Sequence, residues 1–242
     1  MRTVKPRRAS TYVWKLMHLN RSRMVIFLTL FVLAVMLFII NVRPYASLGL
    51  VMLPVSYLLG LYAYRNYILW SSGREGELTV LDELNKLGDE YVVIRNAVIP
   101  PNRGDTDYIV VGPNGVFIVE TKNTGGIVQC DGDVWTRHKV GRRGKPYRLE
   151  IGNPSRQAKR SAKSLKDFIL SRRSDVFKGE TPHLWVCSIL VFTNRDVRLN
   201  LRKPTVEVVE VGKLNEFILR QKSMRLSKAS VDGIAHALAR YV

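Results

Sequence analysis

Two long apolar stretches near the start of the chain dominate its pattern of hydrophobic and polar positions. Residues 24–42 form a run of 19 uncharged residues, and after Arg43 residues 44–64 add 21 more. A helix needs about 20 apolar residues to cross the hydrocarbon core of a bilayer. No small-x-small cleavage site follows the first run, which argues against a signal peptide, and no polar stripe marks it as a core helix. The pattern therefore predicts a transmembrane hairpin over residues 24–64.

Beyond residue 70 the pattern changes to short elements. Ser72 and Glu75 have the spacing of a capping box, which predicts the start of a helix that ends at Gly88. Two β-rich runs, 107–111 and 116–122, flank a Gly-Pro-Asn-Gly turn and predict a hairpin whose second strand is apolar on both faces. Further strands are predicted at 91–99, 125–130, around Trp135, at 184–192 and at 205–211, with a basic loop over 137–148 and helices at 153–173, 213–220 and 227–241. The predicted fold class is α/β, a mixed sheet flanked by helices.

The charge of the chain indicates a polyanionic partner. Lys and Arg number 38 against 20 Asp and Glu, so the net charge is +18. The hydrophobic content of 46% is too high for a disordered basic tail. Two cysteines exclude a disulfide scaffold and a zinc site built mainly from Cys. A folded protein with this charge is expected to meet nucleic acid or anionic lipid.

The basic residues also predict an orientation in the cell membrane. Residues 1–70 carry nine basic residues and no acidic one, and seven of the nine precede residue 24. Because basic flanks stay on the cytoplasmic side, both termini of a two-span protein are expected there. The predicted organisation is a basic cytoplasmic tail (1–23), the transmembrane hairpin (24–64), a domain at 71–195, and a C-terminal strand and helices (196–242) packed on that domain.

Acidic and basic side chains gather where the predicted hairpin strands end. Glu120 and Lys122 are two residues apart, so they share one face of their strand. Asp107 begins the neighbouring strand, close enough for one cation to bridge it and Glu120. Glu77 lies four residues before Leu81 on the apolar side of its helix, where a carboxylate is unfavourable unless compensated. The simpler alternative is structural: Glu120 and Lys122 form a salt bridge, and Asp107 caps a turn.

Several ordered motifs resemble the NERD (nuclease-related) domain family, which is similar in fold to the PD-(D/E)xK restriction-endonuclease-like nucleases. They are Gly73-x-x-Gly76-Glu77, Asp107-Tyr-Ile-Val-Val, Gly115-Val-Phe-Ile-Val-Glu120-Thr-Lys122-Asn123, Gly126, Trp135, Asn153-Pro154-x-x-Gln157 and Val191-Phe192-x-Asn194. The resemblance implies that the two motif acids are Asp107 and Glu120 and that the motif lysine is Lys122. It also matches Glu77 and Gln157 to helical polar positions. The chain departs from the motif at Thr106, where the family pattern has proline.

The resemblance implies a divalent-metal-dependent nuclease acting on DNA, with RNA less favoured and little sequence preference. Mg²⁺ or Mn²⁺ held by Glu77, Asp107 and Glu120 would activate water, while Lys122 and Gln157 orient the water or the phosphate. A phosphate-binding flank is predicted from exposed basic residues, namely Arg142, Arg143, Lys145, Arg156, Lys159 and Arg160. Two alternatives remain open: a non-catalytic, membrane-tethered nucleic-acid-binding or scaffold module, and a basic surface that serves only lipid.

Overall fold

The computed structural model describes residues 2–4, 9–40, 42–102, 104–141, 144–177, 183–222 and 224–242. The chain divides into two compact units. One unit is Ser10–Arg74, and the other joins Met1–Ala9 to Glu75–Val242. The sequence placed residues 1–23 together in a tail, whereas in the structure the first few residues belong to the same unit as the C-terminal part of the chain.

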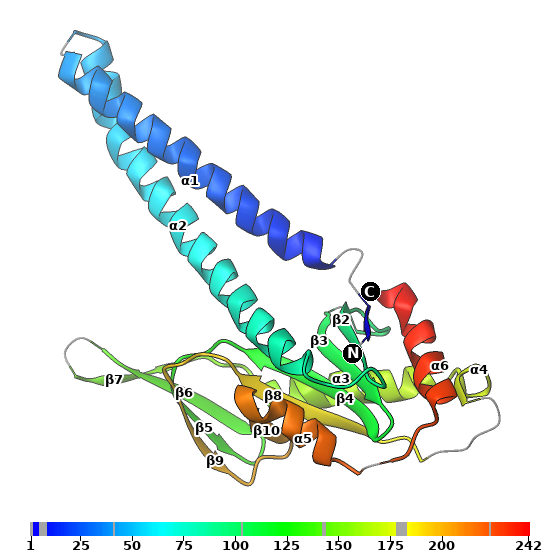
Figure 1. Ribbon diagram of the computed structural model, residues 1–242. Coiled ribbons are helices and arrows are strands. Elements are labelled where there is room, and N and C mark those ends of the chain that lie inside the picture. Colours follow the sequence, from blue (N-terminus) through cyan, green and yellow to red (C-terminus); the bar gives the residue numbers. More distant parts are fainter. Residues whose placement is uncertain are drawn as a thin grey trace. The chain divides into compact units, whose positions relative to one another are not determined.

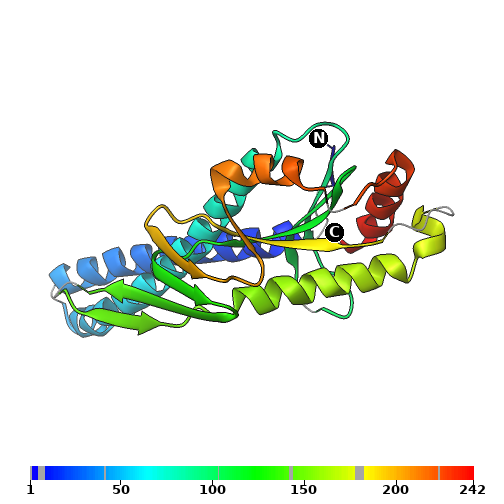
Figure 2. The same cartoon turned by 90° about the horizontal axis from the view of Figure 1, so that it is seen from below.

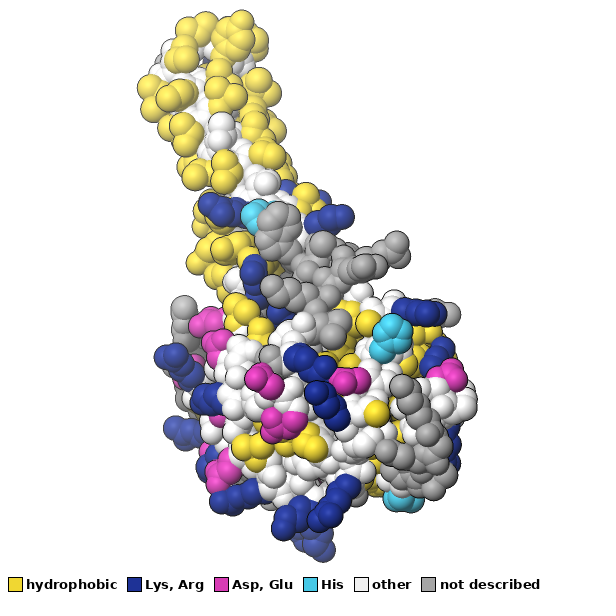
Figure 3. Space-filling view, turned by 45° about the vertical axis from the view of Figure 1, so that its right-hand side comes forward, with side chains coloured by type: hydrophobic (Ala, Val, Ile, Leu, Met, Phe, Trp, Pro, Cys, Tyr) yellow, Lys and Arg dark blue, Asp and Glu magenta, His cyan; other side chains and the backbone are white. Residues whose placement is uncertain are grey.

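The unit Ser10–Arg74 is a pair of long helices, α1 (Ala9–Ile40) and the first part of α2 (Tyr45–Leu84). Both are long and apolar enough to cross a membrane, with hydropathies of 2.8 for Lys15–Ile40 and 1.7 for Tyr45–Leu84. Their most apolar stretches are mainly exposed, 6% and 17% buried respectively, unlike those of soluble core helices. Hydrophobic side chains cover the face of this hairpin seen in Figure 3.

The helix predicted to begin at Ser72 is in fact the last part of α2, which runs without interruption from Tyr45 to Leu84. The prediction of a capping box at Ser72 and Glu75 is therefore wrong. A cap satisfies the N–H groups of a helix's first turn, but here those groups already lie inside a continuous helix. The helix ends at Leu84 and a short turn follows, a few residues before the predicted Gly88.

The second unit is built on a six-stranded mixed sheet with the order β1-β2-β3-β4-β8-β10 (Figure 1). Its strands are β1 (Arg2–Val4), β2 (Val92–Ala97), β3 (Thr106–Gly112), β4 (Gly115–Lys122), β8 (Val186–Phe192) and β10 (Glu207–Glu210). Strands β2, β3 and β4 are antiparallel neighbours, whereas β1 pairs with β2, β8 with β4 and β10 with β8 in parallel. The predicted mixed α/β class is confirmed, and β1 is a strand that the sequence did not predict.

Helices cover both faces of this sheet (Figure 2). Alternate residues of β3 and β4 point to opposite faces, so Ile109 and Ile118 enter one apolar cluster while Tyr108 and Val119 enter the other. The first cluster is completed by α3 (Pro154–Leu170), α4 (Arg173–Phe177) and α6 (Lys228–Leu238), followed by the 3₁₀ turn η2 (Ala239–Tyr241). The second cluster is completed by the end of α2, the 3₁₀ turn η1 (Val211–Lys213) and α5 (Leu214–Arg220).

A second, four-stranded sheet has the order β7-β6-β5-β9. Its strands are β5 (Gly126–Asp131), β6 (Val134–Val140), β7 (Pro146–Leu149) and β9 (Val197–Arg202). The predicted basic loop over 137–148 is thus mostly a β-hairpin, and β9 was not predicted at all. Trp135 anchors the sheet near the start of α3, because its indole N–H donates to Ser155 Oγ at 2.7 Å and its ring lies 5.8 Å from that of Phe192.

Candidate active site

Asp107 and Glu120 lie side by side at one end of the central strands. Tyr108 is paired with Val119 across the antiparallel β3–β4 ladder, so Asp107 and Glu120 are the next two residues of the same ladder. Residues that face each other in a ladder share a face of the sheet. That face is the one covered by α3, which brings Gln157 and Ser161 over the end of β4.

Glu120 is a fully buried carboxylate, with none of its surface exposed. Its Oε2 accepts a hydrogen bond from Gln157 Nε2 at 2.7 Å, and its Oε1 accepts one from Ser161 Oγ at 3.3 Å. Burial, and then the charge of Asp107, raises the pKa of Glu120 to about 8. In the absence of a bound cation, burial and the neighbouring charge of Asp107 therefore favour the protonated form of Glu120.

Asp107 is half-buried and bound to the strand that carries Glu120. Its Oδ2 accepts hydrogen bonds from the backbone N–H and the hydroxyl of Thr121, at 2.6 and 2.7 Å. Burial raises the pKa of Asp107, although the two bonds from Thr121 and the positive charge of Lys122 oppose that rise. Within the described residues no hydrogen bond reaches Oδ1, which leaves one oxygen of Asp107 for a ligand.

Lys122 reaches Glu120 indirectly, through an amide. Its Nζ donates to Gln157 Oε1 at 2.7 Å, while the amide nitrogen of Gln157 donates to Glu120. No ion pair joins Glu120 and Lys122 in the part of the chain that the structure describes, so the salt-bridge alternative does not account for this pair. The arrangement holds an ammonium group and a carboxyl group at one strand end, with Gln157 fixed between them.

Glu77 lies on α2 at the opposite face of β3. Its backbone carbonyl accepts a hydrogen bond from the hydroxyl of Tyr108 at 2.6 Å. The pKa of Tyr108 is raised, mainly by burial and to a smaller extent by the charge of Glu77. Glu77 is half-buried whereas Glu75 is exposed, which agrees with the expected asymmetry between these two acids.

Two neighbouring carboxylates fit the chemistry of a divalent cation. Carboxylate oxygens are the ligands that Mg²⁺ and Mn²⁺ prefer, and the pKa of Glu120 is raised by burial and then by repulsion from Asp107, which a cation would relieve. Among the described residues, however, no group of three or more His, Cys, Asp or Glu side chains is arranged to hold a metal ion. Glu77 is therefore not assembled with Asp107 and Glu120 into the three-carboxylate set that the sequence suggested.

The predicted phosphate-binding flank is only partly described. Lys145, Arg156, Lys159 and Arg160 are all exposed, while Arg142 and Arg143 lie outside the described residues. Lys159 Nζ is bound to Asp133, at 2.9 and 2.8 Å from its two carboxylate oxygens. Arg156, Lys159 and Arg160 lie within one helical turn of Gln157 on α3.

Sequence reasoning missed two residues that contact the carboxylates, Thr121 and Ser161. Ser161 lies one helical turn after Gln157, so the spacing of four residues offered a signal once Gln157 was identified. Thr121 gave no comparable signal, because its hydroxyl meets Asp107 only through the pairing of β3 with β4.

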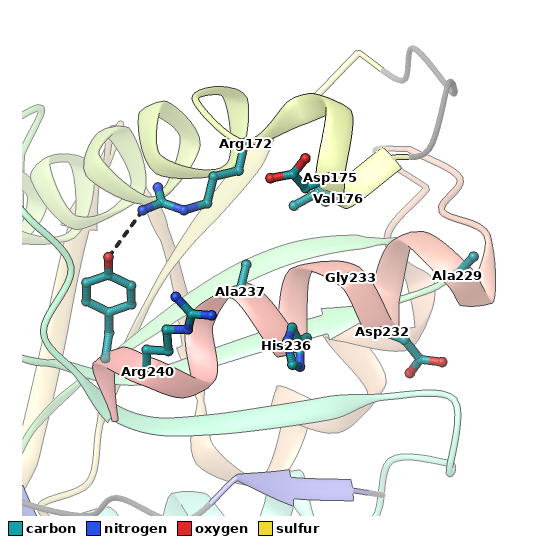
Figure 4. A pocket seen from close by; sticks show the side chains of 10 residues that line it. Arg172, Asp175, Val176, Ala229, Asp232, Gly233, His236, Ala237 and Arg240 are labelled. Atoms are coloured by element: carbon teal, nitrogen blue, oxygen red, sulfur yellow. Dashed lines mark hydrogen bonds between the residues drawn. The ribbon is translucent and has the colours of Figure 1, made fainter.

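A cavity of about 600 Å³ lies well away from these residues, between α4 and α6 (Figure 4). Its lining includes Arg172, which donates to the hydroxyl of Tyr241 at 3.2 Å and stacks over the ring of Phe168 with its guanidinium carbon 4.0 Å from the centroid. None of the predicted site residues lines it. The candidate active site is therefore an open strand end and not this cavity.

Comparison with protein-family models gives a match to the nuclease-related domain over residues 72–193, which is 122 of the 242 residues. Curated proteins and solved structures give no match. The matched range contains the whole strand-end group, from Glu77 on α2 through Asp107, Glu120 and Lys122 to Gln157 on α3. The chain belongs to the nuclease-related domain (NERD) family.

Proposed function

We propose that this protein is a divalent-metal-dependent nuclease that hydrolyses phosphodiester bonds of DNA, or secondarily RNA, with little sequence preference. The observation that carries the proposal is the group at the end of β3 and β4. Two carboxyl groups, one ammonium group and one amide meet there on a single face of the sheet. Phosphodiester hydrolysis needs these functions together, because water must lose a proton while negative charge builds on the phosphate.

Each side chain has a distinct role in this proposal. Asp107 and Glu120 would hold the cation, which when bound supplies a more acidic water and neutralises charge on the phosphate. Lys122 places a positive charge at the same strand end, where it stabilises the negative charge of the transition state. Gln157 holds Lys122 and Glu120 at a fixed separation, and Ser161 fixes the second oxygen of Glu120.

We further propose that the protein is anchored in the cell membrane through residues 24–64, with both termini and the NERD domain in the cytoplasm. The length, apolar composition and exposure of α1 and α2 support the anchor. The excess of basic residues before residue 24 supports the orientation.

A cleavage assay on the full chain in detergent tests the nuclease proposal. The full chain is needed because β1 supplies a strand of the domain's sheet. DNA and RNA substrates are incubated with Mg²⁺, Mn²⁺ or EDTA, and Asp107→Asn and Lys122→Ala are compared with Lys222→Ala, an exposed lysine after α5. The proposal is supported if EDTA abolishes cleavage and if only the two site variants lose cleavage. Both variants should keep the wild-type melting temperature.

A non-catalytic nucleic-acid-binding module is the second candidate function. It is favoured by the surroundings of Glu120, which is fully buried and accepts hydrogen bonds from Gln157 and Ser161, with a pKa raised by that burial. In the same assay, salt-dependent binding of nucleic acid without metal-dependent cleavage would support this candidate and contradict the enzyme.

A further inference from the structure

A groove of about 390 Å³ runs along α3 on the side of strands β8 and β10. Its walls come from one helix and from the beginning of two strands. Its charged and aromatic lining residues are Lys159, Lys163, Lys166, Trp185 and Glu207. A hydrogen bond from Ser188 Oγ to the carbonyl of Ala158, at 3.4 Å, joins the helix to β8 beneath the groove.

Trp185 is the unusual residue of this groove. It stands just before β8 with 55% of its surface exposed, although the neighbouring Val186 and Ala162 are buried. An exposed tryptophan at the rim of an apolar groove is typical of a binding surface, because its large flat ring can stack on a ligand. A stacking platform of this kind suits the π-face of a nucleobase.

Lysines form the helical wall of the groove. Lys159, Lys163 and Lys166 lie on one side of α3, separated along its axis by about 6 Å and then about 4.5 Å. Lys159 is bound to Asp133, whereas Lys163 and Lys166 make no ion pair with any described residue. Glu207 is the one acidic residue in the lining, so the groove carries an excess of positive charge that complements a phosphate backbone.

The groove lies on the other side of α3 from the candidate active site, because at 3.6 residues per turn its lysines point roughly half a turn away from Gln157 and Ser161. Gln157, which binds Glu120 and Lys122, lies on the first turns of α3, and the three lysines follow it toward the helix's C-terminal end. Glu120 pairs with Leu190 across the β4–β8 ladder, five residues beyond Trp185. Five residues of strand are about 17 Å, which is a span of several nucleotides of single strand.

We propose that this groove binds a single-stranded segment of nucleic acid, with a base stacked on Trp185 and the backbone phosphates on Lys163 and Lys166. The inference rests on the proposed nuclease function and gives it a substrate class, namely nucleic acid that is single-stranded where it lies in this groove. A base within a duplex is stacked on its neighbours, so its face is closed to Trp185. The groove therefore discriminates against duplexes.

Binding of fluorescent oligonucleotides to the full chain in detergent and EDTA tests this proposal without cleavage. The probes are oligo-dT, oligo-U and a DNA duplex of the same length. We expect Trp185→Ala to raise the Kd for both single strands about tenfold and to change duplex binding little. Trp185→Phe should restore most of the affinity because it keeps an aromatic face. Leu219→Ala, which removes a similarly exposed apolar side chain from α5, should leave the Kd for the single strands and for the duplex unchanged.

The salt dependence of binding tests the lysines. Replacing Lys163 and Lys166 together with Ala should reduce the slope of log K against log salt by about 1.4 for single strands. Lys222→Ala serves as the control for loss of a positive charge elsewhere. The proposal would be overturned if Trp185→Ala had the wild-type Kd, or if it lost as much affinity for the duplex as for single strands. Full displacement of the oligonucleotides by polyglutamate would also overturn it.

The same measurements separate this inference from the nuclease proposal. If wild type cleaves with Mg²⁺ but Trp185→Ala binds normally, the groove is refuted and the nuclease remains. If wild type shows the expected single-strand binding but no metal-dependent cleavage, the groove is supported and the enzyme is refuted. If oligonucleotides do not bind at all, the groove is refuted, and the cleavage assay with Mg²⁺ or Mn²⁺ decides the nuclease proposal separately.

Discussion

Glu120 combines two properties that conflict in a metal-free protein. It is completely buried, and it lies next to Asp107, so its charged form is unfavourable. The hydrogen bonds from Gln157 and Ser161 nevertheless hold the carboxyl group in one orientation. A group that is held in place but destabilised as an anion is suited to receive a cation, since binding removes the repulsion that the fold maintains.

The pKa of Glu120 predicts how stability depends on pH. Its ordinary value of 4.5 rises to about 8 in the fold, so between these values the folded state keeps a proton that the unfolded chain releases. Stability should therefore fall as pH rises through this window, and Glu120→Gln should flatten the slope. Thermal melts of the full chain in EDTA at several pH values measure this. Glu150→Gln, an exposed control, should keep the wild-type slope; an unchanged slope in Glu120→Gln would contradict the prediction.

Glu77 and Glu75 should differ in their effect on metal binding. Glu77→Gln is expected to weaken the Mg²⁺-induced rise in melting temperature and to reduce Mg²⁺ affinity only a few-fold, because Glu77 lies across β3 from the carboxylate pair and can act on the cation only through its charge. Glu75→Gln removes an exposed charge and should behave as wild type. Melts with and without Mg²⁺ make the comparison. A normal shift in Glu77→Gln would leave Asp107 and Glu120 as the assigned ligands.

At the scale of elements, Gly76 allows α2 to approach the strand ends closely. A Cβ at this position would collide with the hydroxyl of Thr193 and lie 3.1 Å from its Cβ. Thr193 directly follows β8, and its N–H donates to the carbonyl of Lys122 at 3.1 Å. The glycine in the family motif therefore has a physical role, because a larger residue would push on the backbone that carries Lys122.

A double-mutant cycle tests that contact. Gly76→Ala is expected to cost about 1–3 kcal/mol of unfolding free energy, as overpacking typically does. Thr193→Ala alone should cost little, since its buried hydroxyl has no hydrogen-bond partner within the described residues. In the double variant part of the cost should disappear, giving a coupling above about 0.5 kcal/mol. Urea unfolding measures all three variants, and strict additivity would refute the contact.

The elements that the sequence predicted are those whose side chains carry the hydrophobic pattern. Strands β3, β4 and β8 are buried on both faces and appear as apolar runs. Strand β9 alternates apolar residues with Arg and Asn, and its Val197 and Leu199 pack on an apolar cluster, so the sequence did carry a period-of-two signal for it. Strand β7 is largely exposed and is a strand through its backbone pairing with β6. That pairing leaves little trace in the sequence.

The candidate site follows the same logic. The period of two residues placed Glu120 and Lys122 on one face, and the hairpin brought Asp107 beside them. Gln157 came from the family resemblance. Its position between Lys122 and Glu120 depends on how α3 packs over β4. Gln157 is 35 residues from Lys122 and 37 from Glu120 in the sequence, so no local pattern encodes these contacts.

At the scale of the whole molecule, the two apolar helices predict a topology. Short epitopes placed before residue 24 and after residue 242 should both be protected in intact cells and both become accessible after permeabilisation, because two spans return the chain to the same side. Antibody labelling of cells before and after permeabilisation measures this. Opposite accessibility of the two epitopes would exclude the hairpin.

The pairing of β1 with β2 imposes an order on biogenesis. Arg2 precedes both long helices, whereas its partner Val92 follows ninety residues later, after them. Until β2 has been made, β1 has no partner strand and stays unpaired. Completion of the sheet thus requires that both ends of the helical hairpin emerge in the same compartment.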